Sequence, residues 1–426
     1  MADIRPLKAL RYEQGKFPIP LVVPPYDIIN EKQREDLASI EHNMINLDKP
    51  GKDDDPDRYK KAQSRLKDWK EKELLVSDDL LSIYVYSQRF KHLATGEMCE
   101  RLGFFCRLKI EEHYENAIYP HEKTLSAPKA DRLNLMRATQ ANLSPVFGLY
   151  KDDENAASAV FARAMETKPL YDVYVDPDGT EHRLWQVTDG QDIGLLEATL
   201  KGKDMVIADG HHRYETALNY AKEMRELHGD NEDARYNYIL VCLVNFNDPG
   251  LFVLPTHRLL SGVTVTDEIM TELETYFDVT EKSVPEIEKI LMNKTLDETL
   301  LGLYQGKDKA ALLLSLKDMK QLDGIVPESP SEEWRSMEVN VLSYLIIAKI
   351  VKLSEEDFQK IFLFSHDFKE TCEMVDNGEA GCAFLMPPSN NEEIQKVTKA
   401  HEVMPQKTTY FYPKIFSGFV IYDHTV

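Results

Sequence analysis

The sequence predicts a mixed α/β (α+β) fold, because segments with strand and helix patterns alternate along most of the chain. Residues 205–209 form an apolar strand that runs through Gly210 into an amphipathic helix. Apolar side chains at steps of three and four residues indicate this helix: Tyr214, Ala217, Leu218, Ala221, Met224 and Leu227. Gly229 is its expected C-cap. Residues 235–246 contain a fully apolar strand that is typical of the centre of a sheet.

Further elements precede this region. Residues 22–30 read as an apolar strand that ends in a rigid Pro-Pro turn, and such a loop is a plausible wall of a site. A helix that begins near Pro56 should bury one face, made of Tyr59, Ala62, Leu66 and Trp69. Residues 81–90 and 103–110 read as strands on either side of a turn near Gly96, which predicts an antiparallel pair.

The pattern changes beyond Leu260. We expect acid-rich helices and then strands in this part of the chain, at 266–277, 284–292, 300–304 and 310–316. A strongly apolar helix over 337–351 must be deeply packed.

A length of 426 residues is enough for two or three domains. The change of pattern predicts an α/β core over residues 1–262, which contains the Asp-Gly-His-His-Arg segment at 209–213, called the DGHHR loop from here on. A smaller C-terminal α+β lobe over residues 263–426 should pack on this core. Apolar helices in that lobe make a homodimer a reasonable expectation.

Composition narrows the class of protein. A formal net charge of −22 argues against nonspecific DNA binding, which requires a strongly basic face. The five cysteines form no CxxC pair and no metal-finger spacing, which is typical of free thiols in a reducing compartment. No apolar run reaches about 18 residues and the first residues have no apolar core. We therefore expect a cytoplasmic protein without a membrane span or signal peptide.

The DGHHR loop has the layout of an anion site. Gly210 allows a tight turn, and the helix that follows directs its N–H groups and positive dipole end toward whatever lies there. Arg213 can bind a phosphate or carboxylate through two parallel hydrogen bonds, and Asp209 lies at the carboxyl end of a strand, where open α/β sheets bind their ligands. His211, His212 and Arg213 at a helix start oppose the dipole unless an anion is present. A phosphate-bearing ligand is the first expectation, although a purely structural role of the two histidines is the competing interpretation.

A second group of polar residues lies between 119 and 145. His121, Glu122 and Lys123 occupy a proline-bounded loop, where a carboxylate could deprotonate a hydroxyl, hold Mg²⁺ or form an ion pair. Arg132 is a candidate phosphate ligand, and a solvated helix face is the alternative. The same run supplies Asn142 and Ser144 as candidate substrate-binding residues.

Other motifs are weaker. His257 and Arg258 follow an apolar strand and are candidate substrate ligands that could approach the same pocket. No GxGxxG and no GxxxxGK[ST] loop occurs, which disfavours the commonest nucleotide-binding folds. A zinc or two-metal site made of His121, Glu122, Asp209, His211 and His212 lacks the usual ligand spacing, so we expect no protein-built metal site.

Six motifs together resemble a family of conserved bacterial and archaeal proteins classed as domain of unknown function 1015. The resemblance spans nearly the whole chain. Its motifs are VPPYDII at 23–29, HEKTL at 121–125, the DRL and RATQANLSP run at 131–145, ADGHHRYETAL at 208–218, LPTHRLL at 254–260 and MPQKTTYFYPK at 404–414.

This family in turn resembles the ParB and sulfiredoxin superfamily, which includes free-serine kinases and in which a Gly-x-His-Arg type loop opens a helix and binds nucleotide phosphates. The resemblance implies a ParB/sulfiredoxin-like nucleotide-binding core with large helical and strand insertions. It also implies that Gly210, His211, His212 and Arg213 hold the phosphates of ATP or ADP, together with Mg²⁺.

The resulting hypothesis is a nucleotide-dependent phosphotransferase that acts on the hydroxyl of a small, serine-like metabolite. Asp209, Glu122 and Asp27 are the candidate catalytic carboxylates, and Lys123 and Arg132 could help to neutralise the phosphates. Two alternatives stay open: a ParB-like regulatory protein that binds or hydrolyses nucleotide, and a metal-dependent hydrolase.

Overall fold

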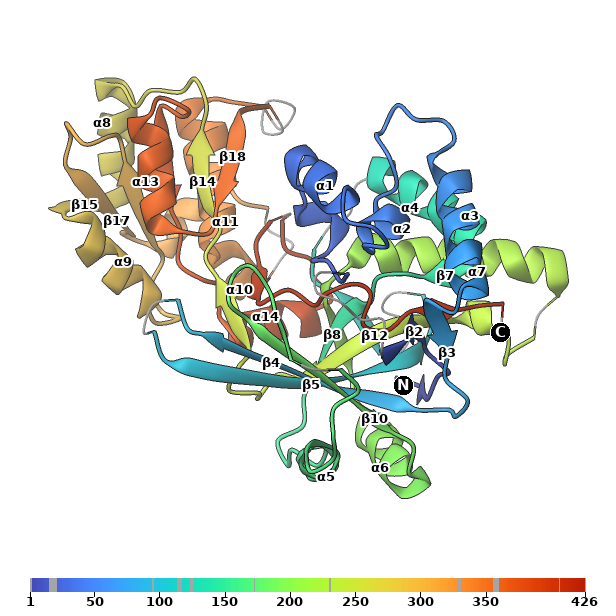
Figure 1. Ribbon diagram of the computed structural model, residues 1–426. Coiled ribbons are helices and arrows are strands. Elements are labelled where there is room, and N and C mark those ends of the chain that lie inside the picture. The colour runs from blue at the N-terminus through green and yellow to red at the C-terminus, as the bar shows by residue number, and fades with distance from the viewer. Residues whose placement is uncertain are drawn as a thin grey trace. The chain divides into compact units, whose positions relative to one another are not determined.

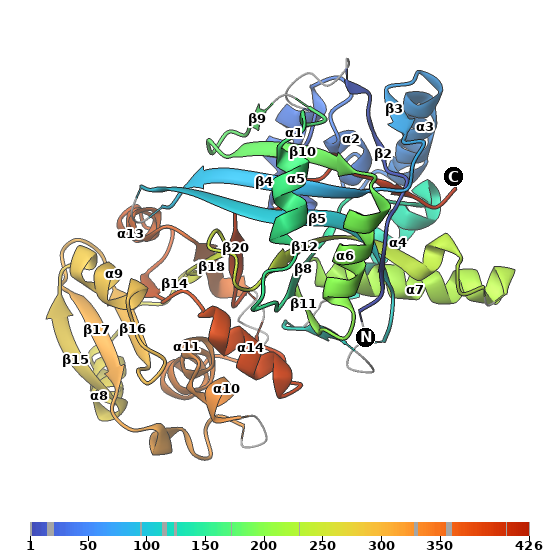
Figure 2. The same ribbon diagram turned by 90° about the horizontal axis from the view of Figure 1, so that it is seen from below.

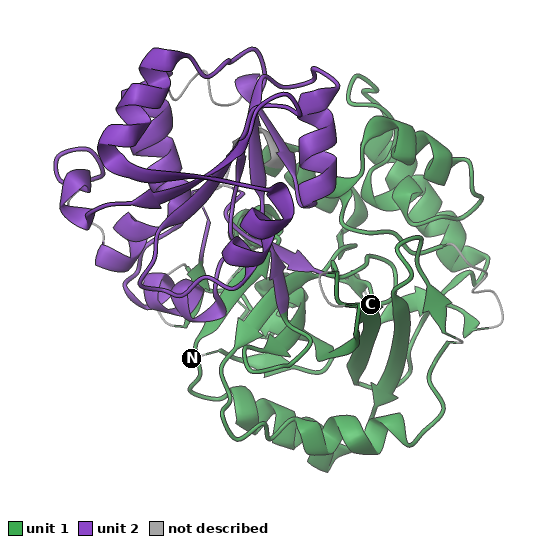
Figure 3. Cartoon of the chain, turned by 90° about the vertical axis from the view of Figure 1, so that its left-hand side faces the viewer, with its two compact units in different colours: residues 1–120, 124–251, 413–426 green, residues 121–123, 252–412 purple. Residues whose placement is uncertain are grey.

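The computed structural model describes residues 2–14, 21–93, 96–112, 117–122, 126–171, 173–229, 231–327, 331–354, 360–405 and 407–425. The chain divides into two compact units, which Figure 3 shows in two colours. Unit 1 comprises Met1–Pro120, Thr124–Leu251 and Pro413–Val426, and unit 2 comprises His121–Lys123 and Phe252–Tyr412. The predicted boundary at 262 lies near one of these divisions. The last residues differ from the prediction, because β21 (Tyr422–Asp423) pairs with β7 (Ala141–Asn142) and so joins the C-terminal segment to unit 1.

A mixed sheet forms the centre of unit 1, with nine strands among the described residues. Its order is β6-β11-β8-β12-β5-β4-β10-β9, and β1 pairs with β5 outside this path. The strands are β1 (Ile4–Arg5), β4 (Ile83–Lys91), β5 (Met98–Lys109), β6 (Ile118–Pro120), β8 (Val146–Tyr150), β9 (Tyr174–Val175), β10 (Glu181–Val187), β11 (Met205–Asp209) and β12 (Tyr238–Asn245). β11 is parallel to β6 and β12 is parallel to β8, whereas the other neighbours are antiparallel.

The described residues of unit 1 also form helices. They are α1 (Glu31–Ala38), α2 (Ile45–Asp48), α3 (Arg58–Glu71), α4 (Ser126–Thr139), α5 (Ser158–Met165), α6 (Gly190–Leu200) and α7 (His211–His228). α5 and α6 lie side by side against one face of the sheet, as Figures 1 and 2 both show. A small second sheet pairs β2 (Leu10–Tyr12) with β3 (Leu75–Ser77).

Sequence patterns explain the core of unit 1. All eight residues of β12 are buried, as expected for an apolar strand at a sheet centre. α7 buries Tyr214, Ala217 and Leu218 in the same cluster as Val241 and Leu243 of β12. The predicted antiparallel pair is confirmed as β4 and β5. Residues 22–23 differ from the prediction, because Val23 forms only an isolated bridge with Ser417.

Unit 2 is built on an antiparallel sheet in the order β15-β17-β16-β19-β14-β18. Its strands are β14 (His257–Leu260), β15 (Phe277–Lys282), β16 (Leu300–Tyr304), β17 (Ala311–Leu316), β18 (Phe362–Ser365) and β19 (Cys382–Leu385), and a separate ribbon pairs β13 (Phe252–Leu254) with β20 (Tyr410–Tyr412). Its helices include α8 (Asp267–Tyr276), α9 (Val284–Met292), α10 (Glu332–Ser336), α11 (Glu338–Asn340), α13 (Phe368–Asp376) and α14 (Asn391–Lys399). The mixed α/β class is thus confirmed.

The helix predicted over 337–351 is present, but most of it has the wider pitch of a π-helix instead of an α-helix. After the short α11, residues Val341–Val351 form a π-helix. Nearly every side chain in this segment is apolar, so the pattern has no polar face that could distinguish one helical pitch from another. Among all described helices, none is both long enough and apolar enough to span a membrane.

Candidate functional site

The DGHHR loop connects β11 to α7 in unit 1, as the sequence predicts. Gly210 has φ 91° and ψ 29°, the left-handed conformation that a glycine adopts without strain. A Cβ atom at this position would lie 2.9 Å from Cζ and Nε of Arg213. Glycine is therefore required both by the backbone turn and by the arginine that packs over it.

The start of α7 presents the positive end of an 18-residue helix. Its first turn holds no acidic residue, and Gly210 has no side chain that could cap the helix. His211 is buried and His212 is half-buried. The hydroxyl of Tyr214 accepts a hydrogen bond from the backbone N–H of Glu111 at 3.0 Å and donates one to its carbonyl at 2.8 Å, which fixes this end of the helix.

A carboxylate between two cations lies beside this helix start. Asp209 Oδ1 accepts a hydrogen bond from Arg213 Nη2 at 3.1 Å, and Asp209 Oδ2 accepts one from Lys414 Nζ at 2.9 Å. All three side chains are largely buried, with 13, 9 and 10% of the area of Asp209, Arg213 and Lys414 exposed. The register of β11 against β8 shifts between Ile207 and Asp209, an irregularity of the kind that redirects a side chain.

These charges set the protonation of the cluster. Burial alone would raise the pKa of Asp209, but the charges of Lys414 and Arg213 outweigh it and hold the pKa far below its usual range. Burial acts to lower the pKa of Arg213, whereas Asp209 and Asp27 raise it above its ordinary value. Asp209 is therefore ionised at neutral pH and lies between two basic side chains.

Asp27 lies in the 3-10 helix Tyr26–Ile28 and is exposed. Its charge acts on both His212 and Arg213, so it belongs to the same electrostatic neighbourhood. Burial lowers the pKa of His212, and Asp27 partly opposes this shift. Lys49 Nζ holds the loop around Asp27 by donating to the carbonyl oxygens of Tyr26 at 3.2 Å and Ile29 at 2.6 Å.

Arg132 contacts carboxylates of unit 1. Its Nη2 donates to Asp131 Oδ2 at 2.6 Å and its Nη1 donates to the carbonyl oxygen of Asp48 at 2.5 Å. Its guanidinium also lies 4.0 Å from the ring centre of Tyr26. These contacts already satisfy much of the guanidinium, so the role of Arg132 as a phosphate ligand stays a prediction.

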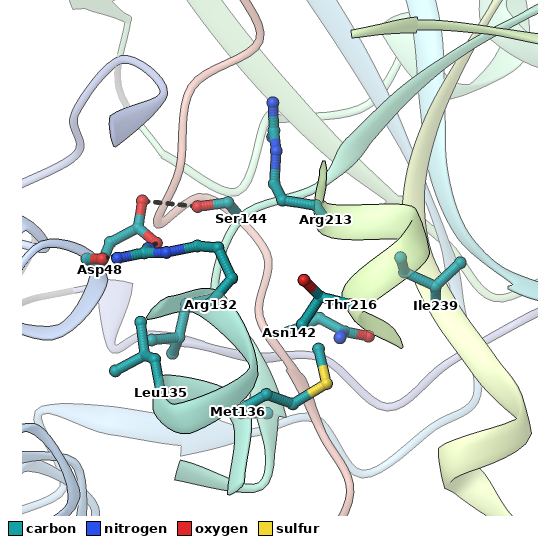
Figure 4. A pocket seen from close by; sticks show the side chains of 11 residues that line it. Asp48, Arg132, Leu135, Met136, Asn142, Ser144, Arg213, Thr216 and Ile239 are labelled. Carbon is teal, nitrogen blue, oxygen red and sulfur yellow. Dashed lines mark hydrogen bonds and ion pairs between the residues drawn. The ribbon is translucent and has the colours of Figure 1, made fainter. Parts of the chain in front are cut away.

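Asn142 and Ser144 are buried beside Arg132 and line a cavity of about 40 Å³. Asn142 Oδ1 accepts from the backbone N–H of Leu240 at 3.1 Å, and Ser144 Oγ donates to Asp48 Oδ2 at 2.5 Å. Figure 4 shows Arg132 directed toward Asp48. The cavity has room for water but not for a nucleotide, because ligand pockets typically measure about 300–1,000 Å³. The structural contacts of Asn142 and Ser144 leave their substrate-binding role a prediction.

Unit 2 contains His121 and Glu122. His121 is fully buried, and its Nε2 lies 2.6 Å from Thr409 Oγ1. Glu122 Oε1 accepts from the backbone N–H groups of Thr408 at 3.1 Å and Thr409 at 3.2 Å. The carboxylate thus binds the 407–409 loop. Lys123, the third predicted residue of this segment, lies outside the described residues.

Unit 2 also contains His257 and Arg258, both buried on β14. His257 Nδ1 accepts from the backbone N–H of Met386 at 3.0 Å, and burial lowers the pKa of His257 to about 3. Arg258 donates to the carbonyl oxygens of Thr256 at 2.9 Å and Lys407 at 3.1 Å. The predicted residues thus fall into separate sets in the two units, and a substrate-binding role of His121, His257 and Arg258 stays a prediction.

Metal ligands do not cluster in the part of the chain that the structure describes, where no group of three or more His, Cys, Asp or Glu side chains could hold an ion. Mg²⁺ can nevertheless bind with a nucleotide through one or two carboxylates and phosphate oxygens, without a dedicated cage. The exposed carboxylate of Asp27 fits such a role, whereas both oxygens of Asp209 already accept hydrogen bonds from cations.

Lys414 is the residue that the sequence interpretation missed, since it lies about two hundred positions from Asp209. The available signal is a lone lysine in the apolar run YFYPKIF at 410–416. A buried lysine normally needs a charged partner, so its surroundings point to a pairing elsewhere in the chain.

The fold and the site together define an α/β protein with two basic side chains paired to one aspartate at a strand-to-helix turn. Residues 4–340 match a family described as "Protein of unknown function (DUF1015)", and the chain belongs to this family. A search among curated proteins gave no match.

Several solved structures show a weak likeness. A conserved hypothetical protein from Pyrococcus furiosus is 15% identical, with 70% of this chain and 89% of that chain covered at a TM-score of 0.33. A free serine kinase in complex with AMP is 14% identical, with 71 and 92% covered at a TM-score of 0.33. SbnI with a C-terminal truncation from Staphylococcus aureus is 11% identical, with 71 and 83% covered at a TM-score of 0.34. Scores this low carry no argument, so the ParB/sulfiredoxin-like core stays a prediction.

Proposed function

We propose that the protein binds a nucleotide at the DGHHR loop and transfers a phosphoryl group to the hydroxyl of a small, serine-like metabolite. The observation that carries this proposal is the cationic edge of the loop, where the start of α7, Arg213 and Lys414 surround a single carboxylate. Phosphates bind well where helix amides and charged donors converge. The resemblance of the motif to the ParB and sulfiredoxin superfamily supports a nucleotide as the source of these phosphates.

Each residue of the loop has a role in this proposal. Gly210 makes the turn into α7 and leaves room for the guanidinium of Arg213 to pack over the loop. His211, His212 and Arg213 donate to phosphate oxygens. The guanidinium of Arg213 neutralises part of the charge that develops on the transferred phosphoryl group, which is the main demand of such a reaction.

Asp209 is a poor general base, because its pKa is held far below the operating pH. It orients Arg213 and Lys414 instead, one through each carboxylate oxygen. Mg²⁺ bound with the nucleotide would neutralise phosphate charge. Glu122 already accepts hydrogen bonds from Thr408 and Thr409. The exposed Asp27 is therefore our candidate to accept the proton of the substrate hydroxyl.

A ligand titration tests the binding step. A ligand that binds only the native state raises its stability by about 2.7 kcal/mol at one hundred times its dissociation constant, so the melting temperature must rise with ligand concentration. We expect ATP or ADP with Mg²⁺ to stabilise the wild type and not Arg213→Ala. Arg163→Ala is the matched control, because it removes an arginine from an exposed arginine–aspartate pair in unit 1, with Asp192.

Transfer is then assayed with nucleotide and hydroxylated metabolites, serine first. Phosphorylated product supports the kinase. Nucleotide hydrolysis that no hydroxyl compound stimulates would replace it with the ParB-like regulatory alternative. Stabilisation by Zn²⁺ or Mn²⁺ alone would favour the hydrolase, and no shift with any ligand would overturn the phosphate site itself.

A further inference from the structure

Unit 1 contains a second, larger cavity of about 470 Å³. Its walls are the start of β5, the start of α5 with the loop before it, and the end of β12 with the loop after it. The described residues that line it all lie outside the DGHHR loop. This volume is within the range of about 300–1,000 Å³ that is typical of small-molecule sites, whereas the cavity beside Arg132 has room only for water.

The larger cavity lies at the opposite end of the sheet from the DGHHR loop. β8 and β12 are parallel neighbours, and Asn245 pairs with Tyr150 at their carboxyl ends. Tyr150 also pairs with Met205 at the start of β11. Asp209, at the other end of β11, pairs with Phe147 instead. The segments that follow β8 and β12 therefore meet at the carboxyl ends of two parallel strands, which is where α/β sheets bind their ligands.

Hydrogen bonds hold the walls of this cavity in position. Asn245 joins the two loops, because its Oδ1 accepts from the backbone N–H of Asp152 at 3.0 Å and its Nδ2 donates to the carbonyl oxygen of Asp152 at 2.7 Å. Asp248 joins the loop after β12 to β5. Its Oδ1 accepts from the backbone N–H of Gly250 at 2.8 Å, and its Oδ2 accepts from that of Leu102 at 3.2 Å. The cavity is thus formed before a ligand arrives, as is usual for small-molecule sites.

Carboxylates give this cavity its charge. Glu100 and Asp248 both line it, and Glu100 Oε1 accepts a hydrogen bond from Ser87 Oγ at 2.5 Å. Among the described residues, no cationic side chain lies at ion-pair distance from either carboxylate. Burial raises the pKa of Asp248; backbone hydrogen bonds and the charge of Arg101 oppose this shift, and the charge of Glu100 adds to it. A cationic ligand fits these surroundings, whereas an anion would meet two carboxylates.

The same cavity has an apolar wall. Phe161 of α5 is 5% exposed and belongs to the core cluster of unit 1, and Leu102 of β5 packs against that cluster. Met98 lines the cavity as well. Apolar walls bind the body of a ligand, and a few polar groups fix its orientation. A ligand that matches both features has an apolar body and a positive charge.

We propose that this cavity is a second ligand site, which binds a small amine with an apolar body. The ammonium lies against Glu100 and Asp248, and the apolar body packs on Phe161 and Leu102. The amine and a nucleotide at the DGHHR loop bind without competition, because the two sites lie at opposite ends of the same strands. The proposal goes beyond the proposed function and does not depend on it, since no residue of the DGHHR loop takes part.

Cys99 provides a direct readout of binding, because it is half-buried and lines the cavity. Cys106, Cys242 and Cys382 are buried. Burial raises the pKa of Cys372 in unit 2 to about 12, so this half-buried thiol should react slowly and its rate is the internal control. The native full-length protein is alkylated with iodoacetamide, and mass spectrometry of the cysteine peptides gives the rate at each thiol.

The probes separate charge from shape. Phenethylamine carries a positive charge and an aromatic body, phenethyl alcohol is its uncharged counterpart, and phenylpropionate is its anionic counterpart. Putrescine is a cation without the aromatic body. We expect phenethylamine to slow the alkylation of Cys99 and not that of Cys372. The other three compounds should bind at least about tenfold more weakly, because each lacks either the charge or the apolar body.

Variants test the carboxylates. Glu100→Gln keeps an acceptor for Ser87 but removes the charge, so it should weaken phenethylamine about 3- to 10-fold and leave phenethyl alcohol within about twofold. Asp248→Asn is the second variant and should have the same effect, with its melting temperature as the test of folding. Glu154→Gln is the matched control, because it removes an exposed carboxylate from the loop after β8 that does not line the cavity. It should bind like the wild type.

Different results would overturn the proposal. Alkylation of Cys99 that phenethylamine does not slow at up to about 10 mM would mean that the cavity binds no such amine. Equal protection by phenethyl alcohol, or wild-type affinity in both Glu100→Gln and Asp248→Asn, would remove the role of the carboxylates. These outcomes leave the proposed function untouched. Protection of Cys99 by ADP with Mg²⁺ would instead mean that the nucleotide occupies this cavity, and it would overturn both proposals.

Discussion

Two His-Arg dipeptides follow apolar strands in this chain, and their arginines lie in opposite electrostatic surroundings. Arg213 of unit 1 donates to the carboxylate of Asp209 at 3.1 Å. Arg258 of unit 2 donates to two backbone carbonyl oxygens, and within the described residues no carboxylate lies at hydrogen-bond distance from it. Carboxylates raise the pKa of Arg213, whereas burial lowers the pKa of Arg258 to about 10 and the charge of Glu122 offsets this only in part.

The difference arises from local structure. Arg213 stands on a helix, four residues after Asp209, so the two side chains can meet beside the same turn. Arg258 stands on a strand, where neighbouring side chains alternate between faces. The dipeptide alone therefore does not define an anion site. The preceding Asp-Gly supplies the paired carboxylate and the tight turn, and the helix that follows supplies its N-terminal end.

The comparison predicts unequal costs of removing the two arginines. Arg213→Met should lower the free energy of unfolding by about 3 kcal/mol, because it leaves the buried Asp209 with one cation fewer. Arg258→Met should lower it by about 1 kcal/mol or less, because an apolar side chain of similar length replaces a buried cation without a hydrogen-bonded carboxylate. Urea unfolding at neutral pH measures both values.

Equal losses in the two variants would contradict this prediction, since both arginines would then depend on their surroundings to the same degree. A larger loss for Arg258→Met would mean that its hydrogen bonds to the carbonyl oxygens of Thr256 and Lys407 outweigh the missing carboxylate.

The helix and strand around Arg213 could be predicted from the sequence, because their hydrophobic patterns involve only neighbouring residues. β11, the turn at Gly210 and α7 follow from an apolar run, a glycine and side chains at helical spacing. In unit 2, α9 and β16 have the predicted bounds for the same reason. Periodicity within about ten residues is sufficient for such elements.

The residues that pair with the predicted site residues could not be predicted, because they come from distant parts of the chain. Lys414 lies 205 residues from Asp209, and Asp48 lies 84 residues from Arg132. No local pattern encodes which lysine of an acidic protein meets which aspartate. Arginine and serine often bind ligands, so the sequence predicts that role for Arg132 and Ser144. Only the structure shows that these side chains contact Asp131 and Asp48.

A smaller effect concerns the pH dependence of the Asp209 cluster. The folded-state pKa of Asp209 is depressed, so its contribution to stability is fully present above the unfolded pKa of about 3.9 and is lost as the pH falls toward the folded pKa. Asp209→Asn should be less stable than the wild type by about 2 kcal/mol at pH 7. This difference should shrink by about 1 kcal/mol between pH 5 and pH 3.

Urea unfolding of both proteins across this pH range is the measurement. Asp27→Asn serves as the control, because Asp27 is exposed and its removal should change stability by less than about 0.5 kcal/mol. A difference between wild type and Asp209→Asn that stays constant down to pH 3 would mean that the carboxylate is not held by Lys414 and Arg213.

The smallest expected effect is the difference between alanine substitutions at the two glycines that flank α7. Gly210 is in the left-handed helical region, with φ 91° and ψ 29°, where alanine costs about 1–2 kcal/mol. Gly229 has φ 85° and ψ 168°, a region almost restricted to glycine, where alanine costs about 1–3 kcal/mol. Only Gly210 is covered by a side chain, because a Cβ there would meet the guanidinium of Arg213 at 2.9 Å, whereas nothing lies within 4 Å of a Cβ at Gly229. The contact with Arg213 should add about 1 kcal/mol to the backbone strain of Gly210→Ala, so the two variants should lose similar stability. Gly210→Ala should also displace Arg213 and lower the affinity for ADP or pyrophosphate. Gly229→Ala should bind both ligands like the wild type. Equal ligand affinity in the two variants would show that the close packing of Arg213 over Gly210 does not shape the site.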